Sequence, residues 1–152
     1  MKILLVQPDS SERMMSWGLF GPPEPLTLEV LAAMVPEHEV KILDLRFDTT
    51  TLEANLSSFQ PDLVGVTGYT ADVPRMRQIC QEVKSCLPAT ITVVGGYHAT
   101  LCPHDFNSDY VDVIVVGEGE VTFPELVSTL EEKRELSAVD GIIYRRQGKQ
   151  VT

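Results

Sequence analysis

Basic residues are scarce in this 152-residue chain. Twelve lysines and arginines stand against 22 aspartates and glutamates, which gives a formal net charge of −10. Nucleic acids and anionic membrane surfaces would repel such a chain, because both carry negative charge. We therefore expect a small molecule or another protein as the partner, and neither a nucleic acid nor a membrane.

Cysteines and long apolar runs are also scarce. The three cysteines, Cys80, Cys86 and Cys102, are odd in number and form no Cys-x-x-Cys pair. The first apolar run breaks at Gln7-Pro8-Asp9, so it is too short for a signal peptide or a membrane span. We expect a reducing, cytoplasmic setting in which the free thiols pack in helices or loops.

Five short runs rich in Val, Ile and Leu alternate with segments of helical periodicity, a pattern typical of α/β proteins. The runs lack polar alternation, which predicts strands covered on both faces, as in a parallel sheet. We predict strands at Ile3–Val6, Val40–Leu43, Leu63–Thr67, Ile91–Val94 and Val113–Val116. We predict helices at Leu26–Val35, Leu52–Phe59, Val73–Cys86 (with Asp72 as N-cap) and Phe123–Glu132, and a short turn near Pro103–Phe106.

Right-handed crossovers between such strands lead to a doubly wound, Rossmann- or flavodoxin-like sheet of about five parallel strands. The tail from Gly141 to Val151 predicts a C-terminal β-hairpin appended to that sheet. We therefore expect a single domain with an α/β core over 1–136 and a hairpin segment over 137–152.

Glycine and polar residues gather at the carboxyl ends of the predicted strands, where doubly wound sheets bind ligands. The most informative segment begins at Val93, because a buried-type strand runs into two glycines and a short polar loop, where bare backbone can approach a ligand. One shared site explains these segments better than unrelated tight turns. They are Gln7-Pro8, Thr67-Gly68-Tyr69-Thr70, Gly95-Gly96-Tyr97-His98 with Thr100, and Gly117-Glu118-Gly119-Glu120.

Motifs for several common cofactors are absent. The first strand is followed by Gln7-Pro8-Asp9-Ser10 instead of a Gly-x-Gly-x-x-Gly dinucleotide loop, and no P-loop string occurs. Ser10-Ser11 copies the flavodoxin phosphate loop poorly. Thr67 stands where a phosphoacceptor receiver domain would need an aspartate. Dinucleotide binding, ATP hydrolysis, flavin binding and phosphoacceptance are therefore not predicted.

A series of segments along the chain resembles the N-terminal cobalamin-binding domain of cobalamin-dependent radical SAM enzymes. Their order and spacing carry the resemblance, since no single segment is decisive. They are Met1–Pro8, Pro22–Ala33, His38–Asp44, Pro61–Thr67, Val94–Thr100, Asp112–Glu120 and the closing Gly141–Arg145.

The resemblance also implies how cobalt is held. In other cobalamin proteins, Asp-x-His-x-x-Gly supplies a cobalt-ligating histidine, and Ser-x-Leu and Gly-Gly follow. Here Thr67-Gly68-Tyr69 takes the place of Ser-x-Leu, and Gly95-Gly96 follows after 25 intervening residues, but the histidine is missing. His38, the first histidine, precedes the second strand and is expected at the opposite end of the sheet. The resemblance thus implies cobalamin bound base-off, with no protein metal ligand.

A corrin with a nucleotide tail implies roles for the predicted site residues. Gly95-Gly96 would give the tail clearance, and the backbone amides near Gly117-Glu118-Gly119 would meet phosphate or ribose oxygens. The hydroxyls of Thr67 and Thr70 could bond the tail or its amides.

Five further side chains keep two interpretations each. Tyr69 and Tyr97 either flank the ring or tail, or cover the core. Glu120 either contacts the ligand or stabilises a helix N-terminus. His98 suits positioning within its loop better than ligation or acid–base chemistry. Trp17, in the long loop from Asp9 to Pro25, either covers the upper corrin face or docks against a missing partner domain, or else packs within its own loop.

No Cys-x-x-x-Cys-x-x-Cys motif occurs, although radical SAM chemistry needs one to hold its cluster. The resemblance therefore implies a non-catalytic module of a longer methyltransferase or cyclase-like enzyme, with S-adenosylmethionine and the [4Fe-4S] cluster in an absent domain in cis. The alternative is a degenerate Rossmann-like scaffold domain that no longer binds cobalamin. An enzyme that uses another cofactor is a weaker option, because no acid–base or nucleophile constellation is present.

Overall fold

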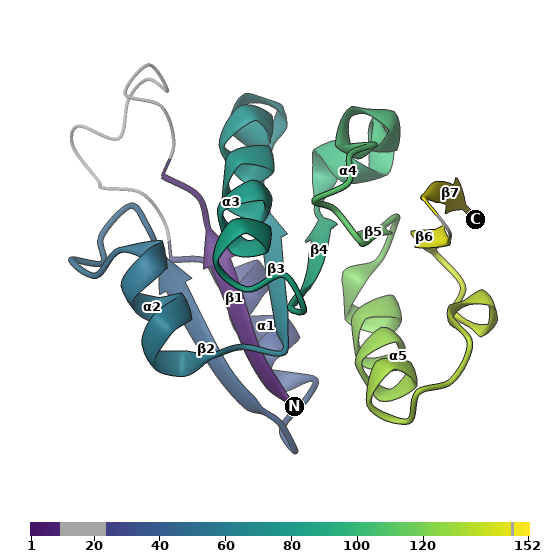
Figure 1. The fold of residues 1–152 in the computed structure, drawn as a ribbon, viewed down its shortest axis with the longest axis horizontal. Coiled ribbons are helices and arrows are strands. Elements are labelled where there is room, and N and C mark those ends of the chain that lie inside the picture. Colours follow the sequence, from purple (N-terminus) through teal and green to yellow (C-terminus); the bar gives the residue numbers. More distant parts are fainter. Residues whose placement is uncertain (10–23, 147) are drawn as a thin grey trace.

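One seven-stranded sheet, in the order β2-β1-β3-β4-β5-β6-β7, organises the chain (Figure 1). The computed structural model describes residues 1–9, 24–146 and 148–152, so the predictions for Trp17 and for most of its loop lie outside the described residues. The strands are β1 (Lys2–Gln7), β2 (Glu39–Asp44), β3 (Leu63–Thr67), β4 (Ile91–Gly95), β5 (Val113–Val115), β6 (Ile142–Arg146) and β7 (Lys149–Val151).

The strand order confirms the predicted doubly wound fold. Strands β1 to β5 pair in parallel in the flavodoxin-like order 2-1-3-4-5. Strand β6 then pairs antiparallel with β5, and β7 pairs antiparallel with β6. The predicted C-terminal hairpin is therefore present, and it extends the same sheet.

Helices cover both faces of the sheet. In Figure 1, α3 lies in front of the strands and α1 lies behind them. Helices α1 and α5 share one hydrophobic core with the sheet, whereas α2 and α3 share the other. The helices are α1 (Leu26–Ala33), α2 (Leu52–Phe59), α3 (Val73–Cys86), α4 (Tyr97–Leu101) and α5 (Gly119–Glu131), with single 3-10 turns η1 (Thr70–Asp72), η2 (Pro103–Phe106) and η3 (Leu136–Ala138).

Successive residues of the central strands supply the two cores in turn. In β1, Leu4 and Val6 point toward α2 and α3, whereas Ile3 and Leu5 point toward α1 and α5. All four are almost completely buried, as expected for a parallel strand covered on both faces. Because each face has its own apolar core, we expect the chain to fold independently.

Two predicted boundaries were wrong. The segment after the glycine pair, expected as a loop, forms the short helix α4. Helix α5 begins at Gly119 rather than at Phe123, so that Pro124 lies inside the helix instead of in its first turn. Asp72 does stand at the N-cap of α3, but its carboxylate accepts a hydrogen bond from the backbone N–H of Tyr69 and does not cap α3.

In the described part of the chain, no helix combines the length and the apolar character needed to cross a bilayer.

We expect Leu126→Ala to lower the free energy of unfolding by about 2–5 kcal/mol, because it leaves a cavity in the core beneath α5. Leu126 is fully buried there. Glu125→Ala, at an exposed position of the same helix, is the control and should change stability by less than about 0.5 kcal/mol. Urea unfolding followed by circular dichroism measures both, and equal effects would contradict the assigned burial.

Candidate functional site: a cavity at the carboxyl edge of the sheet

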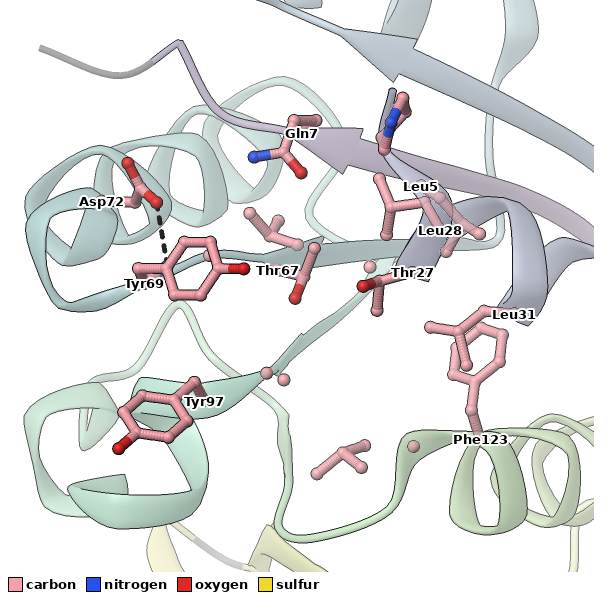
Figure 2. Close-up of a pocket in the computed structure, with 18 of the residues that line it drawn as sticks. Leu5, Gln7, Thr27, Leu28, Leu31, Thr67, Tyr69, Asp72, Tyr97 and Phe123 are labelled. Atoms are coloured by element: carbon pink, nitrogen blue, oxygen red, sulfur yellow. Dashed lines mark hydrogen bonds between the residues drawn. The ribbon is translucent and has the colours of Figure 1, made fainter. Parts of the chain in front are cut away.

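A cavity of about 1050 Å³ opens where β1, β3, β4 and β5 end, on the face that α1 and α5 cover (Figure 2). Ligands of doubly wound sheets bind at this edge. Its lining comprises Leu5, Gln7, Asp9, Glu24–Leu28, Leu31, Leu45, Arg46, Gly65–Tyr69, Asp72, Val93, Gly95–Tyr97, Thr100, Leu101, Val115, Gly117–Glu120 and Phe123.

The floor of the cavity is apolar, and sequence analysis missed it. Leu5, Gly65 and Val93 lie side by side on β1, β3 and β4 and all line the cavity. A Cβ atom at Gly65 would lie 2.9 Å from Leu5 Cδ2. The absence of a side chain at Gly65 therefore leaves the cavity deeper between Leu5 and Val93. A glycine inside a Val- and Leu-rich strand was the available signal, because such a glycine often marks a close approach.

The side walls of the cavity differ in character. Figure 2 shows Leu28, Leu31 and Phe123 at one end and Tyr69 and Tyr97 at the other. The apolar end comes from α1 and α5, which share a core on this face of the sheet. The two tyrosines are 66% and 63% exposed and line the cavity, so they form its rim.

Gly96 joins two of the loops that form the cavity. Its φ is +93°, and a Cβ atom there would lie 2.5 Å from Thr67 Oγ1 and 3.2 Å from the carbonyl oxygen of Gly68. A glycine is therefore required for the loop after β4 to pack against the loop after β3. This loop contact accounts for the glycine independently of the clearance predicted for a ligand.

The hydroxyl of Thr100 joins the next pair of loops. It donates a hydrogen bond to the carbonyl oxygen of Gly96 at 3.1 Å and accepts one from the backbone N–H of Gly117 at 3.0 Å. The loops after β4 and β5 are thereby fixed to one another. Thr100 lines the cavity, but its hydroxyl already has two partners.

The cavity is acidic. Asp9, Glu24, Asp72, Glu118 and Glu120 line it. Glu120 also lies in the first turn of α5, so its two interpretations are compatible.

Arg46 is the one cation among the described lining residues, and it is paired. Its Nε and Nη2 donate to the carboxylate of Asp44 at 2.8 and 2.6 Å. This hydrogen bonding raises the pKa of Arg46. The pairing holds the guanidinium beside β2 at the edge of the cavity.

The structure gathers almost all the predicted site residues around this cavity. The exceptions are Pro8, which is buried, Thr70, which is exposed outside the cavity, and His98. Pro8 is the residue after the last strand residue of β1, and its neighbour Gln7 does line the cavity.

His98 does not line the cavity, and its side chain belongs to a hydrogen-bonded cluster. Its Nδ1 lies 3.1 Å from Thr70 Oγ1, and its Nε2 lies 2.8 Å from Asp105 Oδ2. The donor atoms of His98, Cys102 and Asp105 lie within 4.8 Å of one another, a spacing that could admit a divalent cation. Both imidazole nitrogens already have partners, however, so the contacts favour the positioning interpretation.

None of the three histidines belongs to the described lining of the cavity. His38 Nδ1 lies 3.2 Å from the N-terminal amine of Met1, so it lies at the amino end of the sheet, as predicted. His104 is exposed beside Asp105.

The cysteines have different environments. Cys80 is buried in the core beneath α3, as expected for a packing residue, and this burial raises the pKa of its thiol to about 12. Cys86 is exposed, so the expectation of packing was wrong for this residue. It occupies the last position of α3.

A sequence profile of the B12 binding domain family matches residues 19–127 of the chain. The chain belongs to the B12-binding domain family. The match includes the strands, loops and helices that form most of the cavity.

Relatives of this B12-binding domain confirm the predicted link to cobalamin-dependent radical SAM enzymes. An uncharacterized methyltransferase of Pyrococcus horikoshii, PH0819, is 38% identical over 98% of this chain and 34% of its own length. The cobalamin-dependent radical SAM methyltransferase TokK of Streptomyces tokunonensis is 36% identical over 57% of this chain and 13% of its own. The chain thus spans about a third or less of these proteins.

A solved structure supports the same relationship. The radical S-adenosylmethionine methyltransferase TsrM of Kitasatospora setae, bound to tryptophan and a SAM analog, superposes with a TM-score of 0.81 at 26% identity. The superposition covers 99% of the B12-binding domain and 29% of TsrM. A second structure of TsrM contains cobalamin and a [4Fe-4S] cluster.

We expect Gly96→Ala to destabilise the domain by about 1–3 kcal/mol, because a side chain is strained at positive φ and would collide with Thr67. Gly95→Ala is the matched control. Its Cβ would lie 3.7 Å from Val115 Cβ, an ordinary contact, so stability should be unchanged or slightly higher. Urea unfolding compares the two variants, and equal stability would contradict the loop contact.

Cys80 should resist alkylation in the folded chain at pH 8, because its thiol is buried and its raised pKa keeps it protonated. The exposed Cys86 should be labelled under the same conditions. Iodoacetamide labelling with peptide mass spectrometry, before and after unfolding in urea, measures both. Labelling of Cys80 as fast as Cys86 without urea would show that the assigned packing is wrong.

Proposed function

We propose that this chain is the cobalamin-binding module of a longer cobalamin-dependent radical SAM enzyme. The observation that carries the proposal is the large, glycine-lined cavity at the carboxyl edge of a B12-binding fold. The nucleotide tail would enter the cavity between α1 and α5, and the corrin would lie over the rim formed by Tyr69 and Tyr97.

The cavity fits such a tail in size and chemistry. Its volume of about 1050 Å³ lies just above the range of roughly 300–1,000 Å³ that is usual for ligand pockets. The apolar floor at Gly65 and Val93 suits the flat base of the tail, because neither residue presents a polar side chain. The N-terminal turn of α5, which begins at Gly119, offers backbone N–H groups and a positive dipole end to the phosphate.

The polar lining would orient the tail and the corrin amides. Thr67 can donate or accept a hydrogen bond, and Glu118 and Glu120 can accept from amide or hydroxyl groups. Gly95, Gly96 and Gly117 would let the backbone approach closely. We assign Thr70 and His98 to positioning, since neither lines the cavity.

We infer that cobalamin binds base-off and that no imidazole of this chain ligates cobalt. The absence of all three histidines from the described lining supports this inference. Bound cobalamin supplies a cobalt centre that can carry a methyl group or assist a radical reaction. The residues of this chain bind and orient the cofactor, and none is assigned a catalytic role.

The names of the relatives support the proposed context. Methyltransferases and an anaerobic magnesium-protoporphyrin IX monomethyl ester cyclase are among them. We therefore propose a methyltransferase or cyclase-like parent enzyme in the cytoplasm, with residues 137–152 leading to a radical SAM domain in cis. That domain would hold S-adenosylmethionine and the [4Fe-4S] cluster.

Filling the floor of the cavity tests the proposal. The wild-type chain should retain hydroxocobalamin after desalting and show a base-off absorption spectrum. Gly65→Leu should lose at least about 100-fold in affinity, because the added side chain would occupy the floor and expel the tail, a cost of about 2.7 kcal/mol or more. Gly65→Ala is the matched control, and it should bind more tightly than Gly65→Leu because it adds a single carbon.

Circular dichroism must show both variants folded. Equal affinities for wild type and Gly65→Leu would place the cofactor elsewhere. A folded wild-type chain that retains no cobalamin would favour the scaffold alternative.

A further inference from the structure

His98 occupies an enclosed position between three partners. Its side chain is 9% exposed. Asp105 lies at one ring nitrogen and Thr70 at the other, and the ring of Phe106 packs edge-on with centroids 6.0 Å apart. The imidazole is therefore held at both nitrogens and along one side.

Asp105 determines the direction of the hydrogen bond to Thr70. The hydrogen bond from His98 holds the pKa of Asp105 below its usual range, so the carboxylate is ionised and only accepts. The imidazole Nε2 then carries the proton, and in the neutral ring Nδ1 accepts the hydrogen bond from the Thr70 hydroxyl. Asp105 thus orients the ring for one partner.

Thr70 follows Tyr69 directly, and the loop is fixed on both sides of this tyrosine. The backbone N–H of Tyr69 donates to Asp72 Oδ2 at 2.8 Å, and the next residue is bonded to His98. Although the Tyr69 ring is 66% exposed, its backbone is therefore anchored. On the other side of the rim, Tyr97 precedes His98 in helix α4.

We propose that His98 is a positioning residue that acts through Thr70 to hold Tyr69 at the rim of the cavity in the arrangement that binds the cofactor. The proposal rests on the proposed cobalamin function of the cavity. Hydrogen bonds run from Asp105 through His98 to Thr70. They connect the loop that carries Tyr69 to helix α4, which carries Tyr97. His98 itself touches neither the cavity nor the cofactor.

The test is a double-mutant cycle measured by hydroxocobalamin titration of the chain. His98→Phe keeps a ring against Phe106 but removes both hydrogen bonds, and Thr70→Val removes the hydroxyl at an exposed position outside the core. Both variants lose the hydrogen bond between His98 and Thr70, and each should therefore weaken binding about 2- to 12-fold, the range of one hydrogen bond. Thr70→Ser, which keeps the hydroxyl, should restore the affinity.

In a Tyr69→Ala background, His98→Phe and Thr70→Val should not weaken hydroxocobalamin binding any further, because the side chain that they position is already absent. A purely structural role of His98 would instead cost the same affinity in both backgrounds, and that result would overturn the proposal. His104→Phe, the same substitution at a histidine that is 78% exposed, is the matched control.

Hydrogen exchange in the free protein tests the positioning without cobalamin. The backbone amide of Tyr69 should exchange at least threefold faster in His98→Phe and Thr70→Val than in wild type or Thr70→Ser. Unchanged exchange would overturn the positioning role. Failure of wild type to bind cobalamin, with exchange altered as expected, would overturn the proposed function alone.

Discussion

The covering of one sheet face by α1 and α5 is the constraint on which the rest of the structure depends. Among the described residues, these two helices share the core on that face, while α2 and α3 cover the other. The carboxyl-terminal halves of β3 and β4 remain open to the cavity at Gly65 and Val93. In the order β2-β1-β3-β4-β5, the chain runs from β1 toward one edge of the sheet and from β3 toward the other, so a crevice at the carboxyl ends of β1 and β3 follows from the strand order.

Contacts among the strand-end loops then give the crevice a fixed shape. Gly96 allows the loop after β4 to pack on Thr67 and Gly68, and Thr100 ties that loop to Gly117 after β5. His98 adds a link back to Thr70 after β3. These neighbouring loops therefore form one connected wall, whose parts come from distant segments of the sequence. Such mutual support is how a binding site acquires its geometry before the ligand arrives.

Much of the fold was predictable because burial on both faces leaves continuous apolar runs. The predicted bounds of β3, α2 and α3 agree with the structure, since each is a regular apolar pattern with clear ends. Helix α4 was missed because five residues are too few for a periodic signal. Its path depends on the positive φ of Gly96 and on packing against η2.

The sequence by itself determined the strand runs, the glycine and polar residues at their carboxyl ends, and the family relationship, because these are local patterns in fixed order. Only the tertiary structure decided which of those residues share a cavity. The floor at Leu5, Gly65 and Val93 arises from register between three strands, and His98 leaves the site because Asp105 and Thr70 engage both its nitrogens. Strand register and side-chain direction depend on how neighbouring elements pack together, so they cannot be read from any one segment of the sequence.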